Sequence, residues 1–322
     1  MGGVMGNPWS VYECLLDRAD SAAAIKELVI GLTWTRCRVE ATGLAMSTPI
    51  PTRTLNWSGT LQGQSAKDIA SWVKSWQPHE ASVGMATLNA LLNADDAVLQ
   101  SASTLPGEGP ANLRVFEYFL PRLLGKRVAV VGRYPGLDVY QQQFDLMVLE
   151  RLTSNETDLP DPACEYVLPE ADWVFLTASS LTNKTFPRLA ELSRHATLVL
   201  MGPTVPWVKE LAEFGVDFLA GVRVTDDQAL RQTVMEGGGI RIFESGLQYC
   251  VADIAVETMQ QKKANIARLY NERDSLKQKM NNWYQQTSDK RFPEYSRLEN
   301  VDQRLSKLDS QYKRMWDARN LS

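Results

Sequence analysis

The amino-acid sequence predicts an α/β protein in three parts: an α+β domain over residues 1–108, a Rossmann-like parallel-sheet domain over 109–255, and an α-helical hairpin over 256–322. Three observations lead to this prediction. A Gly- and Pro-rich stretch, STLPGEGPAN, separates two differently patterned regions. The region after it repeats near-continuous apolar runs with helix-length segments between them. The last segment carries apolar heptads.

The N-terminal region mixes helical and strand patterns. The segment WSVYECLLDR predicts a first helix, and IKELVIGLTWTRCRVEA alternates apolar and polar residues as half-buried strands do. Two more helices are expected in SAKDIASWVKSW and PHEASVGMATLNALLN. Ser65 is a candidate N-cap for the first of these, and Pro78 stands in the first turn of the second. These patterns together predict an α+β unit.

The region after the linker reads as a series of buried strands. The apolar runs are RVAVVG, FDLMVLE, DWVFLT, TLVLMG and VDFLAGVRV, and helical patterns such as TFPRLAELSRH and PWVKELAEFG lie between the later ones. Strands that are apolar on both faces and alternate with helices are typical of a parallel sheet that is covered on both sides. Sheets of this kind bind their ligands outside the carboxyl ends of the strands.

The last segment predicts two helices on either side of the polar stretch QQTSDKRF. Their apolar heptad positions are Met259, Ile266, Leu269, Leu276, Met280 and Trp283 in the first helix and Leu298, Val301, Leu305, Leu308, Tyr312 and Met315 in the second. Such heptads predict an antiparallel hairpin with an internal apolar seam. The hairpin is either a packing arm or homodimer element, or a dedicated surface for another protein.

Charge divides the chain unevenly. Residues 256–322 hold 14 Lys and Arg against 9 Asp and Glu, a net +5, so the overall net charge of −4 leaves −9 for residues 1–255. An acidic body is a poor nucleic-acid binder, whereas the basic segment can attract an acidic partner. No apolar run approaches the roughly 18 to 20 residues of a membrane span, and the first residues lack a signal-peptide pattern. We therefore expect a cytoplasmic protein that does not bind membranes.

The first strand of the predicted sheet ends in a glycine turn, GRYPG, which lacks the pattern of a dinucleotide fingerprint. Only Gly132 and Gly136 are present, whereas the G-x-G-x-x-G fingerprint brings backbone amides close to a pyrophosphate. Arg133 could still contact a phosphate. Glu150 closes the second strand, where many Rossmann domains place a ribose-binding carboxylate; the alternative is that it only ends a strand.

Polar residues follow three further strands of the predicted sheet. They occur in LTASSLTNKT, in MGPTVP and in GVRVTDD, which ends at Asp226 and Asp227. Taken singly, such residues are more often helix N-caps than ligand contacts. Because a parallel sheet brings all these strand ends to one edge, their convergence predicts a binding site there.

Several motifs in this order resemble the putative heavy-metal chelation family. They are GLTWTRCRV, GLAMS, WSGTLQG, GMATLNALLN, GKRVAVVGRYPGLD, LPEADWVFLTASSLTNKTFPRLAEL and MGPTVPWVKELAEFGVDFLAGVRVTD, within about residues 10–250. The resemblance implies an N-terminal domain similar to the enolase N-terminal fold, a Rossmann-like domain, and a ligand site in the cleft between them. The matching positions are Trp34, Thr35, Asn89, Gly132, Pro135, Glu150, Thr177, Asn183, Gly202, Pro203, Thr204 and Asp226, and Arg133 joins them as a possible anion contact. The hairpin lies outside the family's pattern.

The donors available for a metal are mainly oxygens. Glu150 and Asp226, with Thr and Asn groups, would suit a hard ion better than zinc or copper. The chain has only two histidines, and its four cysteines form no C-x-x-C pair. A metal held inside an organic chelator would change this reasoning, because the protein would then bind the chelator.

These observations leave three hypotheses. The first is a cytoplasmic accessory protein that binds a metal ion, metal chelate or metallocofactor in the interdomain cleft. The second is an enzyme that uses NAD or S-adenosylmethionine; no nucleophile elbow, Walker loop or metalloprotease motif supports catalysis, so the enzyme assignment is open and leans toward no. The third is an interaction protein that docks on a larger metalloenzyme, during its assembly or repair, through residues 256–322.

Overall fold

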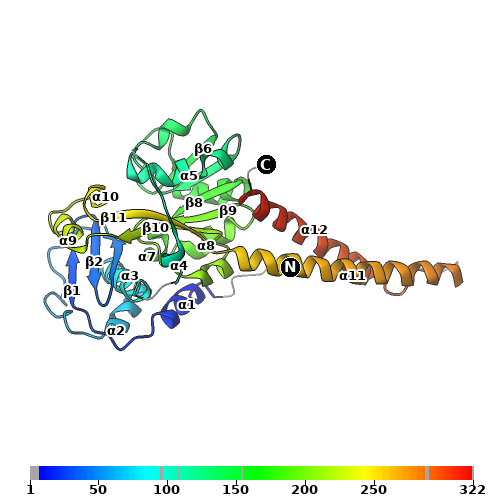
Figure 1. The fold of residues 1–322 in the computed structure, drawn as a ribbon, viewed down its shortest axis with the longest axis horizontal. Helices are drawn as coiled ribbons and strands as arrows, with labels where there is room; N and C mark the ends of the chain where they lie inside the picture. The colour runs from blue at the N-terminus through cyan, green and yellow to red at the C-terminus, as the bar shows by residue number, and fades with distance from the viewer. Residues whose placement is uncertain (1–6, 95–96, 108, 154, 287–289, 321–322) are drawn as a thin grey trace. The chain divides into compact units, whose positions relative to one another are not determined.

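A computed structural model describes residues 7–94, 97–107, 109–153, 155–286 and 290–320. The chain forms two compact units, Met1–Ile254 and Ala255–Ser322. The predicted fold class is confirmed: a small antiparallel sheet with helices, a mostly parallel sheet of eight strands, and a C-terminal helix pair (Figure 1). The domain boundary expected at residue 108 stays a prediction, because the small sheet and the large sheet belong to the same compact unit.

The N-terminal part combines three strands with helices, of which α3 (Pro78–Leu92) packs on the small sheet. Ser65 caps α2 by accepting a hydrogen bond from the Asp68 backbone N–H, and Pro78 begins α3, as predicted. Gly43 allows α3 to pack closely on the sheet, because a Cβ there would lie 2.1 Å from the Ala90 backbone nitrogen. The elements are α1 (Ser10–Arg18), β1 (Glu27–Ile30), β2 (Trp34–Arg38), β3 (Thr42–Met46), α2 (Ala66–Ala70), α3 (Pro78–Leu92) and α4 (Ala97–Ser101).

The large sheet has the strand order β4-β11-β10-β9-β8-β5-β6-β7. The six strands β5 to β10 run parallel. If β5 is counted as the first strand, they stand in the order 3-2-1-4-5-6, which is that of a doubly wound sheet. The switch point, where the strand order reverses, lies between β5 and β8. The strands are β4 (Ser103–Thr104), β5 (Arg127–Val131), β6 (Asp145–Glu150), β7 (Leu159–Pro160), β8 (Trp173–Thr177), β9 (Thr197–Met201), β10 (Phe218–Val224) and β11 (Leu247–Asp253). Helices connect them: α5 (Arg114–Leu123), α6 (Cys164–Val167), α7 (Ser179–Thr182), α8 (Phe186–Leu192), α9 (Asp227–Met235) and α10 (Ile242–Ser245).

All five predicted strands of this sheet are present, with three additions. The strand β11 pairs antiparallel with β10 and then with β4, so the sheet is mixed and the start of the predicted linker is an edge strand. The chain reverses direction between β10 and β11 through α9 and α10 instead of crossing back over the sheet. The segment predicted as a helix in PWVKELAEFG is a 3-10 helix over Lys209–Phe214.

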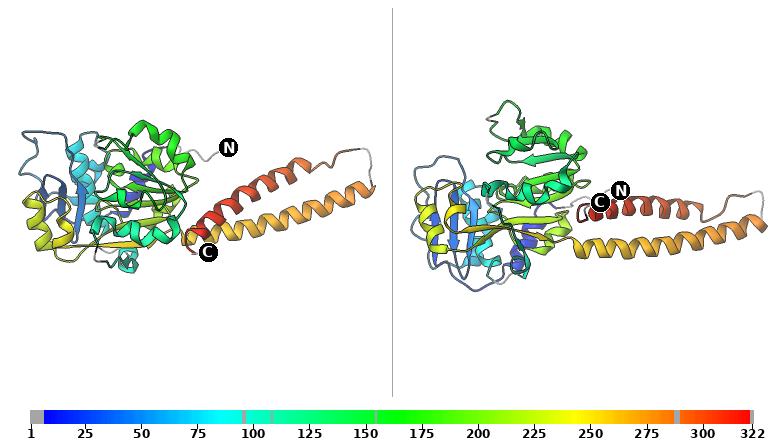
Figure 2. Two further views of the ribbon diagram at one scale, coloured as in Figure 1. Left: turned by 90° about the horizontal axis from the view of Figure 1, so that it is seen from above. Right: turned by 45° about the horizontal axis from the view of Figure 1, so that its top comes forward.

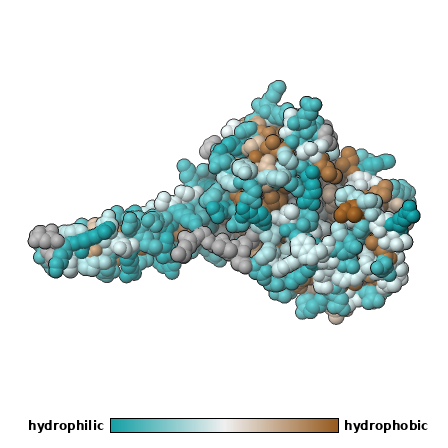
Figure 3. Space-filling model, turned by 180° about the vertical axis from the view of Figure 1, so that it is seen from behind, coloured by the Kyte–Doolittle hydropathy of each residue, from teal (hydrophilic) through white to brown (hydrophobic). Residues whose placement is uncertain are grey.

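The C-terminal unit consists of α11 (Val256–Gln286) and α12 (Tyr295–Asp317). The two helices run antiparallel, because Lys262 bonds to Gln311 near one end and Lys279 to Glu294 near the other (Figure 2). Eight of the twelve predicted heptad residues form the seam: Leu269, Leu276, Leu298, Val301 and Leu305 are buried between the helices, and Ile266, Met280 and Leu308 pack against them. On the face drawn in Figure 3 the helix pair is mostly hydrophilic, whereas hydrophobic side chains gather in patches on the larger unit. No described helix is long and apolar enough to cross a membrane.

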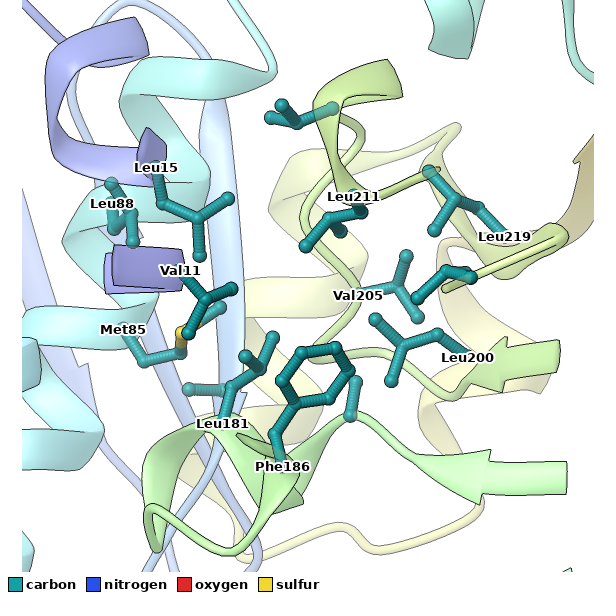
Figure 4. Packing of buried hydrophobic residues seen from close by; sticks show 14 of the residues in the cluster. Val11, Leu15, Met85, Leu88, Leu181, Phe186, Leu200, Val205, Leu211 and Leu219 are labelled. Carbon is teal, nitrogen blue, oxygen red and sulfur yellow. The ribbon is translucent and has the colours of Figure 1, made fainter. Parts of the chain in front are cut away.

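One continuous core joins the N-terminal helices to the large sheet. Val11, Leu15 and Met85 face Leu181 and Phe186 in a common cluster (Figure 4). The buried Tyr12 hydroxyl adds a directed contact, donating to the Leu181 carbonyl at 2.9 Å. This packing fixes the N-terminal part against the carboxyl ends of β8 and β9, which is where the candidate site lies.

Candidate ligand-binding cavity

The carboxyl ends of the parallel strands open into a cavity of about 830 Å³. It lies at the switch point of the sheet, because the turn after β5 and the turn after β8 both line it. The opposite wall comes from β2, from the end of β3 and from the segment between α9 and α10. The cavity is thus the cleft between the N-terminal part and the large sheet.

Two glycine turns shape the sheet side of the cavity. Gly132 and Gly202 follow β5 and β9 with φ angles of 94° and 109°, a backbone region that side chains rarely adopt. A Cβ on Gly132 would lie 3.0 Å from the Thr177 methyl carbon, and one on Gly202 would lie 3.5 Å from the Tyr134 hydroxyl. Burial raises the pKa of Tyr134, and the Thr177 hydroxyl counters this in part, so the phenol stays neutral. The glycines therefore leave room for Tyr134 and Thr177 beside the cavity.

Glu150, at the end of β6, uses its carboxylate to hold the neighbouring loops. One oxygen accepts from the Arg133 backbone N–H and the other from the Arg151 backbone N–H, both at 2.8 Å. The Arg133 side chain in turn pairs with Asp158 and Asp138, both at 2.6 Å. Glu150 and Arg133 thus line the cavity but are engaged with the protein itself.

Two long-range hydrogen bonds hold the wall opposite the sheet. Trp34 Nε1 donates to the Gly239 carbonyl at 3.0 Å, and the Met46 backbone N–H donates to the Thr204 hydroxyl, also at 3.0 Å. Trp34, Met46, Thr204 and Gly239 all line the cavity. The first bond joins β2 to the segment between α9 and α10 within that wall, and the second joins the wall to the turn after β9.

The structure brings ten of the thirteen predicted site residues to this cavity. They are Trp34, Gly132, Arg133, Pro135, Glu150, Thr177, Asn183, Gly202, Pro203 and Thr204.

The other three predicted residues do not line the cavity and have structural contacts. Thr35 is fully buried and shares a hydrogen bond with the Ser47 hydroxyl. Asn89 is buried, and its amide donates to the Leu44 and Thr204 carbonyls at 2.8 and 2.9 Å. Asp226 caps α9 by accepting from the Ala229 backbone N–H. Asp226 and Glu150 therefore do not face one cavity as a pair.

Asp227, the neighbour of Asp226, has the more extensive contacts. Its carboxylate accepts hydrogen bonds from Arg36, Arg38 and Thr42, which lie on β2 and β3. Burial alone would raise the pKa of Asp227, but the hydrogen bonds from Arg36 and Thr42 and the charges of Arg36 and Arg38 outweigh it, and the pKa lies below its usual value. This cluster joins the small sheet to α9.

Sequence reasoning missed several residues that line the cavity. Tyr134 lies inside the GRYPG turn, and Ser180 and Lys184 lie inside the LTASSLTNKT segment. The available signal was their position beside the chosen residues, which were selected because they match the family's motifs. Phe243 and Tyr249 also line the cavity and carry no such signal, because α10 and β11 were not predicted.

The cavity offers few donors for a bare metal ion. The described part of the chain contains no group of three or more His, Cys, Asp and Glu side chains placed to hold one. Cys164 lines the cavity, but burial, with smaller contributions from Asp161 and Glu165, raises the pKa of its thiol to about 11, which disfavours the thiolate that binds metals. These residues do not fit a directly coordinated ion.

A doubly wound sheet, a cavity at its switch point and a small antiparallel sheet beside that cavity define a Rossmann-like α/β fold. Sequence models described as "putative heavy-metal chelation" match residues 12–92 and residues 114–253. The chain belongs to this family, as its motifs predicted. The helix pair lies outside both matched segments.

Proteins of known sequence and structure agree with this assignment. A crystal structure of a family member from Desulfitobacterium hafniense is 32% identical, with a TM-score of 0.67, over 76% of this chain and 98% of that one. A member from Pyrococcus horikoshii, 21% identical, shares the fold with a TM-score of 0.63 over 76% of this chain and 98% of its own. The uncharacterized protein MJ0500 of Methanocaldococcus jannaschii is 34% identical over 113 residues, 33% of this chain and 44% of the relative, so the chain spans less than half of that relative's length.

Proposed function

We propose that this protein is a cytoplasmic accessory protein that binds a metal as an organic complex, a metal chelate or metallocofactor, in the cavity at the switch point. The observation that carries the proposal is the cavity itself. Its volume of about 830 Å³ is that of a site for an organic molecule, and its walls offer hydroxyl, amide, aromatic and cationic groups. Those groups recognise a chelator, whereas a bare ion needs converging ligands. Membership of the putative heavy-metal chelation family supports the proposal that the bound molecule contains a metal.

Isothermal titration calorimetry of the full chain tests this proposal. Nickel chloride, nickel citrate, iron(III) citrate and metal-free citrate are titrated separately, and elemental analysis is made of protein purified from its native host. We expect a preformed complex to bind more tightly than the aquo ion. Equal or tighter binding of nickel chloride would contradict the proposal, as would the failure of every metal probe together with metal-free native material.

A matched pair of variants at Trp34 locates the binding event. Trp34 is buried in the cavity wall and its indole N–H donates to the Gly239 carbonyl. Trp34→Ala removes both the wall and this bond, whereas Trp34→Phe keeps an aromatic ring and loses only the donor. We expect the complex to bind measurably to Trp34→Phe and much more weakly to Trp34→Ala. Equal binding by the wild type and Trp34→Ala would place the site elsewhere.

The second candidate is an enzyme that uses NAD or S-adenosylmethionine, and the strand order of the sheet favours it. Doubly wound sheets of this order bind dinucleotides at the switch point. A thermal-shift screen separates the two candidates, because a ligand at about 100 times its dissociation constant adds about 2.7 kcal/mol of stability. Stabilisation by a nucleotide and by no metal complex would favour the enzyme.

The helix pair is proposed to dock this protein on a larger, acidic metalloprotein. Its net charge of +5 and its mostly hydrophilic face support an electrostatic association. A full chain and a chain ending at Ile254 are compared for co-purification from the native host. Docking predicts that only the full chain retains an acidic partner in low salt. If the full chain is instead a dimer and the truncated chain a monomer, the helix pair is a homodimer element.

A further inference from the structure

Lys184 differs from the other cations that line the cavity. Arg133 pairs with Asp158, Arg151 with Asp161, and Arg188 with Glu165. Lys184 has no carboxylate partner among the described residues. Its ammonium donates to two backbone carbonyls, those of Ser75 and Thr182. An ammonium has three N–H donors, so one donor has no described acceptor, and Lys184 is among the residues that line the cavity.

The surroundings of Lys184 hold it in place without neutralising it. Its side chain is half-buried and its ammonium lies 5.9 Å from the centre of the Trp76 ring. Its backbone has a φ of 66°, and no other described non-glycine residue has a positive φ. A strained backbone of this kind persists when the surrounding structure determines it strongly, and it occurs often in ligand-binding sites.

A second polar group in the same wall also lacks a partner among the residues that the structure describes. Ser180 is 1% exposed, lines the cavity, and its hydroxyl makes no hydrogen bond to any of them. It lies four residues before Lys184, in α7, which follows β8. A buried hydroxyl without a partner and a half-buried ammonium without a counter-charge are both costly, and one anionic ligand group would satisfy both requirements.

We propose that Lys184, with Ser180, forms an anion-binding subsite that holds a carboxylate or phosphate group of the ligand. This subsite rests on the proposed function, because it requires that the cavity binds an organic ligand. It specifies that an anionic group of that ligand lies next to Lys184. The three arginines in the wall are neutralised by their carboxylates, so Lys184 supplies the charge that selects an anion.

The charge state of Lys184 makes the subsite dependent on pH. Burial lowers the pKa of the free Lys184 ammonium to about 8. The charged groups on the surrounding elements are themselves paired: Glu80 with the Ser75 hydroxyl, Lys74 with Glu13, and Arg188 with Glu165 and Glu191. A bound anion raises the pKa of Lys184 again, so binding above pH 8 takes up a proton and affinity falls by up to about tenfold per pH unit.

Calorimetry of the full chain with nickel citrate and with inorganic phosphate, at pH 7 and pH 9, tests the subsite. Buffers of different ionisation enthalpy report proton uptake directly. Lys184→Met keeps the length of the side chain and removes its charge, Lys184→Arg keeps the charge, and Lys26→Met is a control at a surface Lys–Glu pair. Thermal unfolding confirms that each variant is folded. The stronger of the two probes distinguishes a carboxylate from a phosphate ligand.

We expect Lys184→Met to weaken binding roughly 10- to 100-fold at pH 7 and to abolish proton uptake at pH 9. Lys184→Arg should bind within a few-fold of the wild type at pH 7, and Lys26→Met should behave as the wild type. Unchanged affinity and unchanged proton uptake in Lys184→Met would overturn the subsite while leaving the proposed function intact.

If the wild type binds neither nickel citrate nor phosphate, that result counts against the proposed function. A chemical probe then still tests whether Lys184 forms an anion-binding subsite. Pyridoxal 5′-phosphate is an anionic aldehyde; it condenses with a neutral amine to an imine with loss of water, and borohydride reduces the imine to a stable secondary amine. The subsite predicts that limiting reagent at pH 8 labels Lys184 before exposed lysines such as Lys26, as mapped by peptide mass spectrometry. Labelling of Lys184 no faster than Lys26 would overturn the subsite.

Discussion

The two units of this chain are stabilised in different ways. In the unit that ends at Ile254, single side chains join segments far apart in the sequence: Arg36 bonds to Asp227 across 191 positions, and Trp34 bonds to Gly239 across 205. In the helix pair the contacts are near in sequence and repeat along a seam, from Lys279–Glu294, 15 positions apart, to Lys262–Gln311, 49 apart. A cavity needs residues from distant segments, whereas a heptad seam needs only its neighbours.

This difference teaches where a single substitution acts. A residue that joins distant segments of the larger unit has no substitute nearby, so its loss should affect both the fold and the shape of the cavity. A residue of the seam has equivalent neighbours on either side, so its loss should remain local. Four substitutions, one of them with a pH dependence, test this difference, beginning with the largest expected effect.

Asp227→Ala should be the most damaging substitution. It removes the carboxylate that meets Arg36, which is 1% exposed, and leaves that guanidinium with Glu27 alone. Breaking a buried ion pair from one side costs about 3 kcal/mol or more. Urea unfolding should show this loss, whereas Asp226→Ala, which removes only the cap of α9, should cost about 1 kcal/mol. Equal losses at the two adjacent positions would contradict the role assigned to the Asp227 cluster.

The same cluster predicts a dependence on pH. The folded-state pKa of Asp227 lies below its unfolded value, so its contribution is fully present above the unfolded pKa, about 4, and is lost as the pH falls through the folded pKa. The difference in unfolding free energy between the wild type and Asp227→Asn should therefore be constant from pH 5 to 7 and shrink below about pH 4. A difference that grows on acidification would show that the pKa is raised instead.

Leu276→Ala should have the next largest effect, confined to the helix pair. Leu276 is buried in the seam against α12. Leu→Ala in a core costs about 2–5 kcal/mol, and a narrow seam places this position at the lower end. Hydrogen exchange should quicken in α11 and α12 and stay unchanged in the large sheet. The control Ser275→Ala, at the exposed neighbouring position, should leave exchange unaltered. Faster exchange in β8 or β9 would mean that the two units unfold together.

The sequence allowed the helix pair and the parallel strands to be predicted because their patterns are periodic. Leu269, Leu276, Leu298, Val301 and Leu305 follow heptads, and all five parallel runs became strands. The strand β11 escaped prediction because antiparallel pairing with β10 depends on where α9 and α10 return the chain.

The candidate site was predictable where strand ends determine it. Gly132, Thr177 and Gly202 follow from the topology of a parallel sheet. Asp226 and Asp227 were indistinguishable in sequence, and only the direction of each side chain separates a helix cap from the partner of Arg36. Lys184 was missed because its distinguishing property, a cation without a carboxylate partner among the described residues, depends on contacts with the distant Ser75.

Gly202→Ala should have an intermediate effect and act on both the fold and the cavity. At a φ of 109° an added Cβ is strained by about 1–2 kcal/mol. It would also approach the Tyr134 hydroxyl beside the cavity, so ligand affinity should fall with stability. Gly239→Ala is the matched control in the opposite wall, since a Cβ there would make a similar contact, at 3.6 Å with the Thr33 hydroxyl, but from a backbone outside the positive-φ region. Gly239→Ala should be neutral or slightly stabilising in thermal unfolding; a loss equal to that of Gly202→Ala would show that crowding, and not backbone conformation, decides the result.

Arg297→Gln should have the smallest effect of the four. Arg297 bonds to Glu272 at 2.7 Å and to Glu294 at 3.3 Å, but its side chain is 58% exposed, so solvent and salt screen both contacts. We expect a small drop in the thermal midpoint of the helix pair at low salt that disappears at 0.5 M salt, since the Debye length there is well under 10 Å. The apolar seam alone then accounts for the pairing of α11 with α12. If Arg297→Gln instead loosened the helix pair as much as Leu276→Ala, with no dependence on salt, the charged flank would share that role, and the contrast with the larger unit would narrow.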